Sequence, residues 1–287
     1  MLRALVWWKI MPQRKDLNMP SNGARTMDIA YTKGFKMKED LILIEEKHPL
    51  IHNITNYVAM NFVANCLLAI GASPIMARAL EEVEEISSRC NALALNLGIP
   101  ERKSIQAMIK AGTIARQKNI PIVFDVVGVG ATSFRMKAAK EIISICHPTV
   151  VKGNANEIEA LYAQHVENVG IDSFFETFEI KEQAKLLAQR LSCVIVATGS
   201  TDIITDGIAT TSIYAGDPMM RKVTAMGCAS TGIIASFLSI NNTPFSACIH
   251  AMQAMGTAGE RAAAISKGNG SMMINFLDEL CNLKSDE

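Results

Sequence analysis

The sequence has few of the features that place a protein in a membrane, on nucleic acid or outside the cell. No apolar run reaches the ~18 residues that a membrane-spanning helix requires. Lysine plus arginine and aspartate plus glutamate number 28 each, so no excess charge favours nucleic acid or an anionic membrane as a partner. The seven cysteines include no CxxC pair, which disfavours a zinc or dithiol centre and suits a reducing, cytoplasmic setting.

Several common catalytic signatures are also missing. The chain has no GxxxxGK[ST] segment, which excludes a P-loop nucleotide site. The segment GVGATS at 128–133 lacks the third glycine of a GxGxxG dinucleotide fingerprint. Neither HExxH nor GxSxG occurs, so a zinc-protease helix and a nucleophile elbow are excluded as well. A phosphate or nucleotide site in this chain must therefore be built from other segments.

The first 36 residues differ from the rest of the chain. Both tryptophans, Trp7 and Trp8, lie there, and residues 12–28 contain turn formers without a helix or strand period. We interpret 1–36 as a poorly ordered N-terminal extension. We expect 37–287 to form a single domain, because α/β folds often exceed the usual domain length as one unit.

Short β-branched runs alternate with amphipathic segments along this domain. Strands are predicted at 91–98, 121–128, 148–154 and 194–200, with a hairpin in 202–215. Helices are predicted at 56–71, 103–119, 134–146, 156–164, 181–193, 228–240 and 244–266. The alternation is typical of βαβ units, so we expect an α/β fold with a mostly parallel central sheet and helices on both faces.

The loops that follow the predicted strands are where a site is expected, because ligands of such sheets bind beyond the carboxyl ends of the strands. Four of the five loops combine glycine with hydroxyl or carboxyl groups, at 128–132, 153–157, 198–200 and 223–228. Glycine allows main-chain amides to approach a ligand closely, and such amides can form a phosphate site. The loops therefore predict a binding site for a phosphate group.

The loop before 228–240 carries the most informative segment, Met226-Gly227-Cys228. The first turn of the following helix offers free amides to an anion. The alternative is a small-residue helix start that simply packs in the core.

Asn154-x-x-Glu157 opens another helix just beyond a strand. One interpretation is a helix cap, with Asn154 as the capping residue and Glu157 in the first turn. The other is a carboxylate that holds Mg²⁺ through water, since magnesium keeps much of its hydration shell.

An ordered set of motifs then identifies a family. HNITNYV (52–58), GASPIM (71–76), DVVGVGAT (125–132), KGNANEI (152–158), ATGSTD (197–202) and VTAMGC (223–228) resemble hydroxyethylthiazole kinase in order and spacing. The resemblance covers about residues 40–280. It implies a ribokinase-like fold and transfer of the γ-phosphate of ATP to the hydroxyl of 4-methyl-5-(2-hydroxyethyl)thiazole in thiamine salvage. It also implies Mg²⁺ and a homotrimer with active sites at the subunit interfaces.

The resemblance implies roles for individual residues, motif by motif. On the acceptor side, Met76 and Ala225 match substrate-contacting positions, and Asn56 is a further candidate for substrate binding. On the nucleotide side, Lys152 and Thr198 match ATP-binding positions. Catalysis falls to Gly227 and to Cys228, which stands where related sugar kinases carry an aspartate base. Asp125 and Glu157 are the candidates for the metal side.

The chain departs from the usual family pattern at three places. It reads TAMGC where members often read TGAGC or TGTGC, so Ala225 and Met226 add bulk to the loop. Val126 replaces a proline, and Lys152 replaces an arginine, which keeps the charge but loses bidentate geometry.

Two rival functions therefore stay open. One is a related enzyme acting on another acceptor, such as a hydroxymethylpyrimidine kinase or a nicotinamide nucleotide hydrate dehydratase. The other is a non-catalytic ligand sensor.

Overall fold

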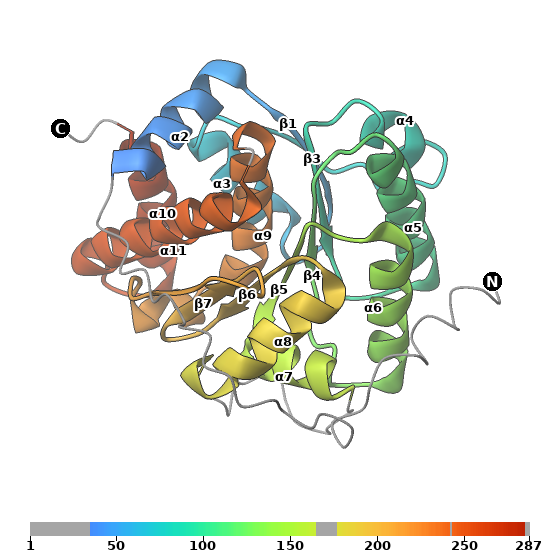
Figure 1. Ribbon diagram of the computed structural model, residues 1–287. Helices are drawn as coiled ribbons and strands as arrows, with labels where there is room; N and C mark the ends of the chain where they lie inside the picture. The colour runs from blue at the N-terminus through green and yellow to red at the C-terminus, as the bar shows by residue number, and fades with distance from the viewer. Residues whose placement is uncertain (1–34, 165–176, 242, 285–287) are drawn as a thin grey trace.

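Eight short strands form one sheet through the centre of the molecule (Figure 1). The computed structural model describes residues 35–164, 177–241 and 243–284. The strands are β1 (Leu50–Ile54), β2 (Ser73–Ile75), β3 (Ala92–Asn96), β4 (Ile122–Asp125), β5 (Val150–Asn154), β6 (Val194–Thr198), β7 (Asp202–Thr205) and β8 (Thr210–Ile213). Their order across the sheet is β2-β1-β3-β4-β5-β6-β7-β8. The six strands β1 to β6 run parallel to one another. Strands β7 and β8 form a hairpin at one edge, in which β7 is antiparallel to both β6 and β8. The mostly parallel α/β architecture predicted from the sequence is confirmed.

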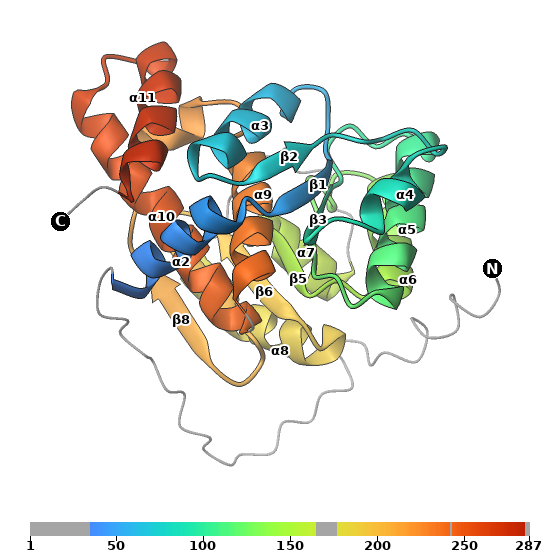
Figure 2. The same ribbon diagram turned by 90° about the horizontal axis from the view of Figure 1, so that it is seen from above.

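Helices cover both faces of the sheet (Figures 1 and 2). One face carries α4 (Val83–Ser87), α5 (Arg102–Gln117), α6 (Ser133–Cys146), α7 (Ala155–Ala163), the short 3-10 helix η1 (Thr177–Ile180) and α8 (Lys181–Leu191). The other face carries α2 (Phe35–Lys47), α3 (Met60–Ala69), α9 (Met226–Ile240), α10 (Pro244–Ile265) and α11 (Asn269–Asn282), with η2 (Pro218–Lys222) before α9. A separate hydrophobic core fills the space on each face. Among the helices described, none has the length and hydropathy that a membrane span requires.

Helix boundaries differ from the predicted ones where side chains compete for the main chain. The helix predicted over 56–71 begins only at Met60, because Asn56 Oδ1 accepts hydrogen bonds from the amides of Val58 and Ala59 and holds a turn there. Its predicted end at Gly71 is confirmed, since Gly71 has a φ of 91° and a side chain there would clash with Glu45. Helix α9 begins at Met226, two residues before its predicted start.

Helix α2, the first in the described part of the chain, begins at Phe35, so the last two residues of the expected extension are helical. The rest of that extension, with both tryptophans, lies outside the described residues. Asp40 on α2 is buried, and its Oδ2 lies 2.6 Å from Nδ1 of His250 on α10 and accepts a hydrogen bond from Asn241. The helix is therefore an integral part of the core on this face.

Candidate functional site

The parallel register places three polar side chains in one row at the carboxyl edge of the sheet. Asn96 at the end of β3 is paired with Asp125 at the end of β4, and Asp125 is paired with Lys152 on β5. All three side chains are buried. In the next row, Asn154 at the end of β5 is paired with Thr198 at the end of β6. The strand ends predicted to carry the site therefore do converge.

Asp125 is the centre of this row. Its Oδ2 accepts three hydrogen bonds, from Lys152 Nζ at 3.0 Å, Asn96 Nδ2 at 3.1 Å and Thr231 Oγ1 at 2.7 Å. These bonds offset the cost of burying the charges of the ion pair. Its other oxygen, Oδ1, is buried and has no hydrogen-bond partner among the described residues. One face of the carboxylate is thus fixed, and the other is available to a ligand.

Lys152 connects the row to the first turn of α9. Besides its ion pair with Asp125, its ammonium donates a hydrogen bond to the carbonyl of Gly227 at 2.8 Å. Burial by itself lowers the pKa of Lys152, but the negative charge of Asp125 and the neighbouring Cys228 and Glu157 outweigh it, so the pKa is raised overall. The ammonium therefore stays charged and is available to phosphate oxygens.

The start of α9 presents uncapped amides beside this ammonium. Its N-cap residue Ala225 has a left-handed conformation, with φ 71° and ψ 2°, and makes no side-chain capping bond. The amide of Ala229 bonds to the carbonyl of Ala225, whereas the amides of Gly227 and Cys228 find no acceptor in the described part of the chain. A Cβ built on Gly227 would meet only Lys152 Nζ, at 3.6 Å. The space in front of Gly227 is therefore open, as an anion site requires.

Cys228 and Asn56 lie on the opposite side of Asp125 from β6. Asn56 Nδ2 donates to Asn96 Oδ1 at 3.0 Å and lies 3.7 Å from Cys228 Sγ. Burial and the charge of Asp125 raise the pKa of Cys228, against the effects of Lys152, Asn96 and Asn56. The thiol is thus protonated at neutral pH. The other cysteines among the described residues are buried, apart from the exposed Cys281.

Glu157 forms the helix cap that one interpretation of the sequence predicted. Its Oε2 accepts the amide of Asn154 at 2.7 Å, while its own amide bonds to Asn154 Oδ1 at 2.9 Å. Its Oε1 accepts the amide of Gly128 at 2.6 Å, which fixes the glycine loop after β4. Burial and the charge of Asp125 raise the pKa of Glu157, and these amide bonds oppose the shift. Each oxygen keeps a lone pair, so a metal-side role stays a prediction.

The described residues contain no cluster of three or more His, Cys, Asp or Glu side chains placed to hold a metal ion. Protein ligands alone would therefore not complete a metal site here. Asp125 Oδ1, which is buried and unpartnered, is the atom that fits a cation best. A hard oxygen ligand of this kind suits magnesium, which commonly takes one or two carboxylates together with water and phosphate.

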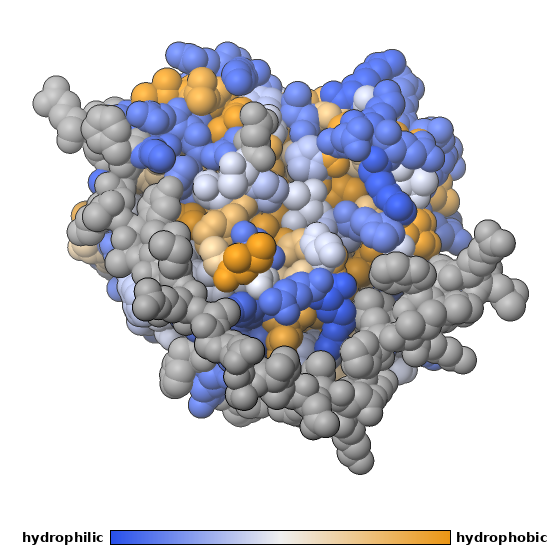
Figure 3. Space-filling view, in the orientation of Figure 1, coloured by the Kyte–Doolittle hydropathy of each residue, from blue (hydrophilic) through white to orange (hydrophobic). Residues whose placement is uncertain are grey.

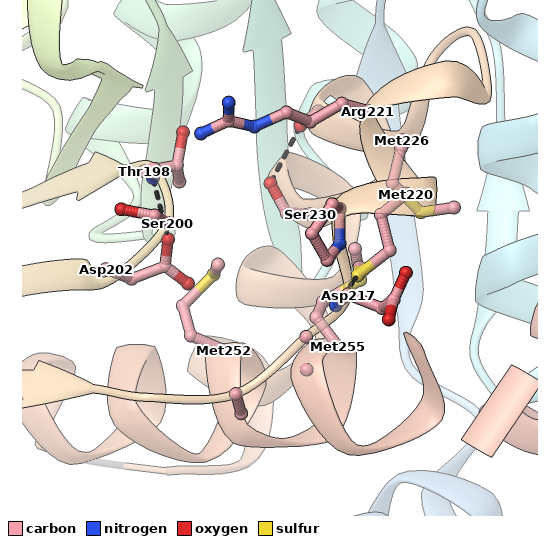
Figure 4. A pocket seen from close by; sticks show the side chains of 16 residues that line it. Thr198, Ser200, Asp202, Asp217, Met220, Arg221, Met226, Ser230, Met252 and Met255 are labelled. Atoms are coloured by element: carbon pink, nitrogen blue, oxygen red, sulfur yellow. Dashed lines mark hydrogen bonds between the residues drawn. The ribbon is translucent and has the colours of Figure 1, made fainter. Parts of the chain in front are cut away.

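A cavity of about 300 Å³ opens next to the start of α9 (Figure 4). Its walls include the turn from Thr198 to Asp202, helix η2 with Arg221, and Gly227 and Ser230 on α9. Four thioether side chains give it an apolar lining: Met220, Met226, Met252 and Met255. The space-filling view shows apolar side chains at the middle of this side of the molecule, with hydrophilic residues around them (Figure 3). The predicted Thr198 therefore shares a pocket with Gly227.

Met76 lies at the far side of the site, just after the edge strand β2. It is partly buried and packs on the same hydrophobic core as Ala225 and Cys228. Two contacts hold its loop: the guanidinium of Arg78 lies 4.2 Å from the ring centre of Tyr57, and His52 bonds through Nε2 to the carbonyl of Ala77 at 2.8 Å. The segments that carry Met76 and Asn56 are thereby tied together.

Sequence reasoning missed two polar residues of the site. Asn96 links Asn56 to Asp125, and its position as a polar residue ending a buried strand was a usable signal. Asp202 lines the cavity and was seen only as the last residue of the ATGSTD motif. The methionine lining of the cavity left no local pattern, because its members come from η2, α9 and α10.

Known proteins resemble the chain over most of its length. The model of the Hydroxyethylthiazole kinase family matches residues 41–286. A hydroxyethylthiazole kinase of Thermoanaerobacter pseudethanolicus is 44% identical over 250 residues, which are 86% of this chain and 95% of that protein. A hydroxyethylthiazole kinase protein from Pyrococcus horikoshii, whose structure is known, is 34% identical in sequence to this chain. The two structures superpose with a TM-score of 0.80 over 88% of this chain and 96% of that one. A ribokinase-like superfamily protein from Enterococcus faecalis, 12% identical, shares the fold with a TM-score of 0.61 over 89% of this chain and 98% of its own.

Proposed function

Because the chain belongs to the hydroxyethylthiazole kinase family, we propose that it transfers the γ-phosphoryl group of ATP to the hydroxyl of 4-methyl-5-(2-hydroxyethyl)thiazole. The observation that carries the proposal is the meeting of an uncapped helix start, a buried ammonium and a half-satisfied carboxylate at one point of the sheet edge. Phosphoryl transfer needs positioning and charge neutralisation more than covalent chemistry, and these groups supply both.

The nucleotide is bound on the β6 side of this point. The cavity beside Thr198 and Gly227 is large enough to hold part of a nucleotide, and its methionine walls suit an aromatic base. Its triphosphate runs toward the amides of Gly227 and Cys228. Lys152 neutralises the phosphate charge, and in binding it exchanges its bond with the Gly227 carbonyl for bonds to phosphate oxygens.

Mg²⁺ accompanies the nucleotide, and the residues present fit it. Asp125 would hold it through Oδ1, with Glu157 nearby through water, while phosphate oxygens and water complete its shell. When bound, the ion neutralises charge on the phosphates. Asp125 keeps its Oδ2 on Lys152, Asn96 and Thr231 throughout, so its orientation is fixed before any ligand arrives.

The acceptor alcohol is bound on the opposite side, among Met76, Asn56 and Cys228. Asn56 and Cys228 meet beside Asp125, so a hydroxyl there faces the γ-phosphoryl group held at Gly227. The Cys228 thiol is neutral and cannot act as a strong base in the ground state. It positions the hydroxyl by contact, since a loose transition state requires little early deprotonation of the alcohol. Ala225 at the start of α9 closes this side of the site.

We further propose that the protein is a cytoplasmic homotrimer whose active sites lie at subunit interfaces. Exposed apolar side chains near the β2 edge support it: Tyr57 and Val58 after β1, and Leu68 on α3, are each about three-fifths exposed. These side chains come from one stretch of the chain, 57–68, and apolar side chains gathered in one region are a common feature of protein interfaces. Light scattering of the purified protein would measure the mass directly, and a monomeric active enzyme would contradict the proposal.

The decisive experiment is a turnover assay with ATP and Mg²⁺ over a panel of acceptors. The thiazole alcohol is expected to be phosphorylated with the highest kcat/KM, ahead of a hydroxymethylpyrimidine. Hydrated nicotinamide nucleotide should not be consumed. Preferred turnover of either competitor would replace the proposed acceptor, and nucleotide binding without turnover of any acceptor would indicate a sensor.

A further inference from the structure

Asp202 is a buried carboxylate in the cavity with no place in the mechanism described so far. It begins β7 and is only 9% exposed. Its Oδ1 accepts a hydrogen bond from the amide of Gly199 at 3.0 Å, which closes the turn between β6 and β7. Its second oxygen, Oδ2, has no hydrogen-bond partner among the described residues, and the side chain lines the cavity (Figure 4). One oxygen of Asp202 is structural, and the other is left for a ligand.

The ionised form of such a carboxylate is energetically unfavourable in these surroundings unless a ligand forms a hydrogen bond with it. Burial raises the pKa of Asp202 to about 7, and the Gly199 bond and the charge of Lys152 only partly oppose this. The other cavity walls near it are largely thioether, including Met252 and Met255. A carboxylate oxygen that faces a cavity from a largely buried side chain is expected to meet a hydrogen-bonding partner in the functional complex.

The order of groups around the cavity indicates which part of a nucleotide it meets. The phosphate end is at Gly227 and Lys152, where a further carboxylate would be repelled by the phosphates. The methionine end suits the base. Asp202 lies at a distance from the Gly227 helix start, beside Thr198 on the neighbouring strand end and next to Met252 (Figure 4). A ribose joins base to phosphate, and its hydroxyls are donors that a carboxylate can accept, as in dinucleotide sites.

We propose that Asp202 Oδ2 accepts a hydrogen bond from a ribose hydroxyl of the nucleotide and thereby selects ribonucleotides over deoxyribonucleotides. The inference rests on the proposed use of ATP and assigns the sugar-recognising residue of that same site. Asp202 contacts the co-substrate far from the transferred phosphoryl group, so it controls nucleotide affinity rather than the chemical step.

The test compares ATP with 2′-deoxy-ATP and 3′-deoxy-ATP in the parent protein and in Asp202→Asn. The asparagine keeps an oxygen for the Gly199 amide but replaces the acceptor Oδ2 by a donor, so the turn is retained. In the parent, the KM of at least one deoxy analogue should exceed that of ATP by about 10-fold, the value of one charge-assisted hydrogen bond. In Asp202→Asn this ratio should fall to about 2-fold or less, with kcat for ATP changed much less than KM.

Asp217→Asn is the matched control, because Asp217 lines the same cavity and also accepts a main-chain amide, that of Met219, through Oδ1. Its ribo-to-deoxy ratio should equal that of the parent. A ratio lost in Asp217→Asn but kept in Asp202→Asn would overturn the assignment. Equal KM values for ATP and both deoxy analogues in the parent would overturn it without any variant.

Two further measurements distinguish recognition of the ribose by Asp202 from recognition of the base, and failure of this inference from failure of the proposed function. Inosine triphosphate lacks the 6-amino group of adenine; if Asp202→Asn changed the ATP-to-inosine-triphosphate ratio and left the deoxy ratios intact, Asp202 would read the base instead. Should no acceptor be phosphorylated, the proposed function fails, yet the nucleotide-induced rise in Tm with each analogue still tests sugar recognition. Discrimination in the parent that disappears in Asp202→Asn supports the inference in that case too.

Discussion

The site has a polar, hydrogen-bonded side and an apolar, methionine-lined side, which meet at Gly227 at the start of α9. On the side of β3 to β5, Asn96, Asp125 and Lys152 are held at fixed distances by a connected set of hydrogen bonds. On the side of β6 and β7, the cavity is lined by methionines, whose long thioether side chains adapt to the shape of a ligand. The charged groups are therefore prearranged for the reacting phosphoryl group, while the apolar wall leaves room for the rest of the nucleotide.

Breaking the polar row should give the largest effect. Asp125→Leu removes the partner of a buried ammonium, so we expect the free energy of unfolding to fall by about 3–5 kcal/mol and turnover to disappear. Adding Lys152→Met removes the unpaired charge as well, and most of the stability should return without activity. Urea denaturation and a turnover assay measure the two quantities separately.

The control for that pair is Asp278→Asn, on the exposed side of α11. Its stability should stay within about 0.5 kcal/mol of the parent, because a surface substitution leaves no buried charge. Equal destabilisation by Asp278→Asn, or no recovery in the double variant, would show that the row is not an electrostatic unit.

Blocking the helix start should have the next largest effect, now on turnover rather than stability. A Cβ on Gly227 fits the structure, but the branches of Gly227→Val would occupy the open space in front of the amides. We expect a loss of more than about 100-fold, whereas Cys228→Ala should cost about 100-fold or less, since a neutral thiol is a poor general base. The measurement is kcat at saturating ATP and thiazole, with circular dichroism to verify folding. A dead Cys228→Ala beside an unaffected Gly227→Val would reverse these roles.

The cavity side can be tested through its pH dependence. The pKa of Asp202 is raised to about 7, so the folded protein holds a proton that the unfolded chain releases at lower pH. Its contribution to stability is therefore present at low pH and lost as the pH rises toward 7. Between pH 5 and pH 8 we expect the parent to lose about 2–3 kcal/mol relative to Asp202→Asn. Parallel pH profiles of unfolding free energy for the two proteins would argue against the burial of this charge.

The smallest expected effect is on the free energy of unfolding and concerns the backbone of Ala225, which lies just before α9, between the polar side and the cavity side. Ala225 has a left-handed conformation that costs an alanine roughly 1 kcal/mol. Ala225→Gly should therefore be neutral to stabilising by up to about 1 kcal/mol, after the greater entropy of unfolded glycine is subtracted. Ala264→Gly, exposed in the last turn of α10, is the control and should destabilise by up to about 1 kcal/mol. A comparable loss at both positions would show that no strain is stored at Ala225.

The sequence identified the framework well because periodicity and strand-end glycines are local signals. The carboxyl-edge location of the loops after these strands followed from the alternation of strands and helices, and the structure confirms it, whereas Asp125, Lys152 and Thr198 were singled out by the family resemblance. The register between neighbouring strands could not be predicted from the sequence, and this register brings Asn96 beside Asp125. The Asn154-x-x-Glu157 motif allowed two interpretations of Glu157; the structure confirms the helix cap, and the metal role stays a prediction.

The hairpin after β6 separates the ligand edge of the sheet from an exposed turn. Because β7 runs antiparallel to β6, it is the strand among the eight described whose first residue lies at the ligand edge, and it delivers Asp202 there. The same reversal sends the tip of the hairpin to the opposite end of the sheet, where Ile208 is 85% exposed. A short insertion or a fluorescent label at this tip should therefore leave the chemistry undisturbed. The residue assigned to the nucleotide and the exposed turn therefore lie at the two ends of β7.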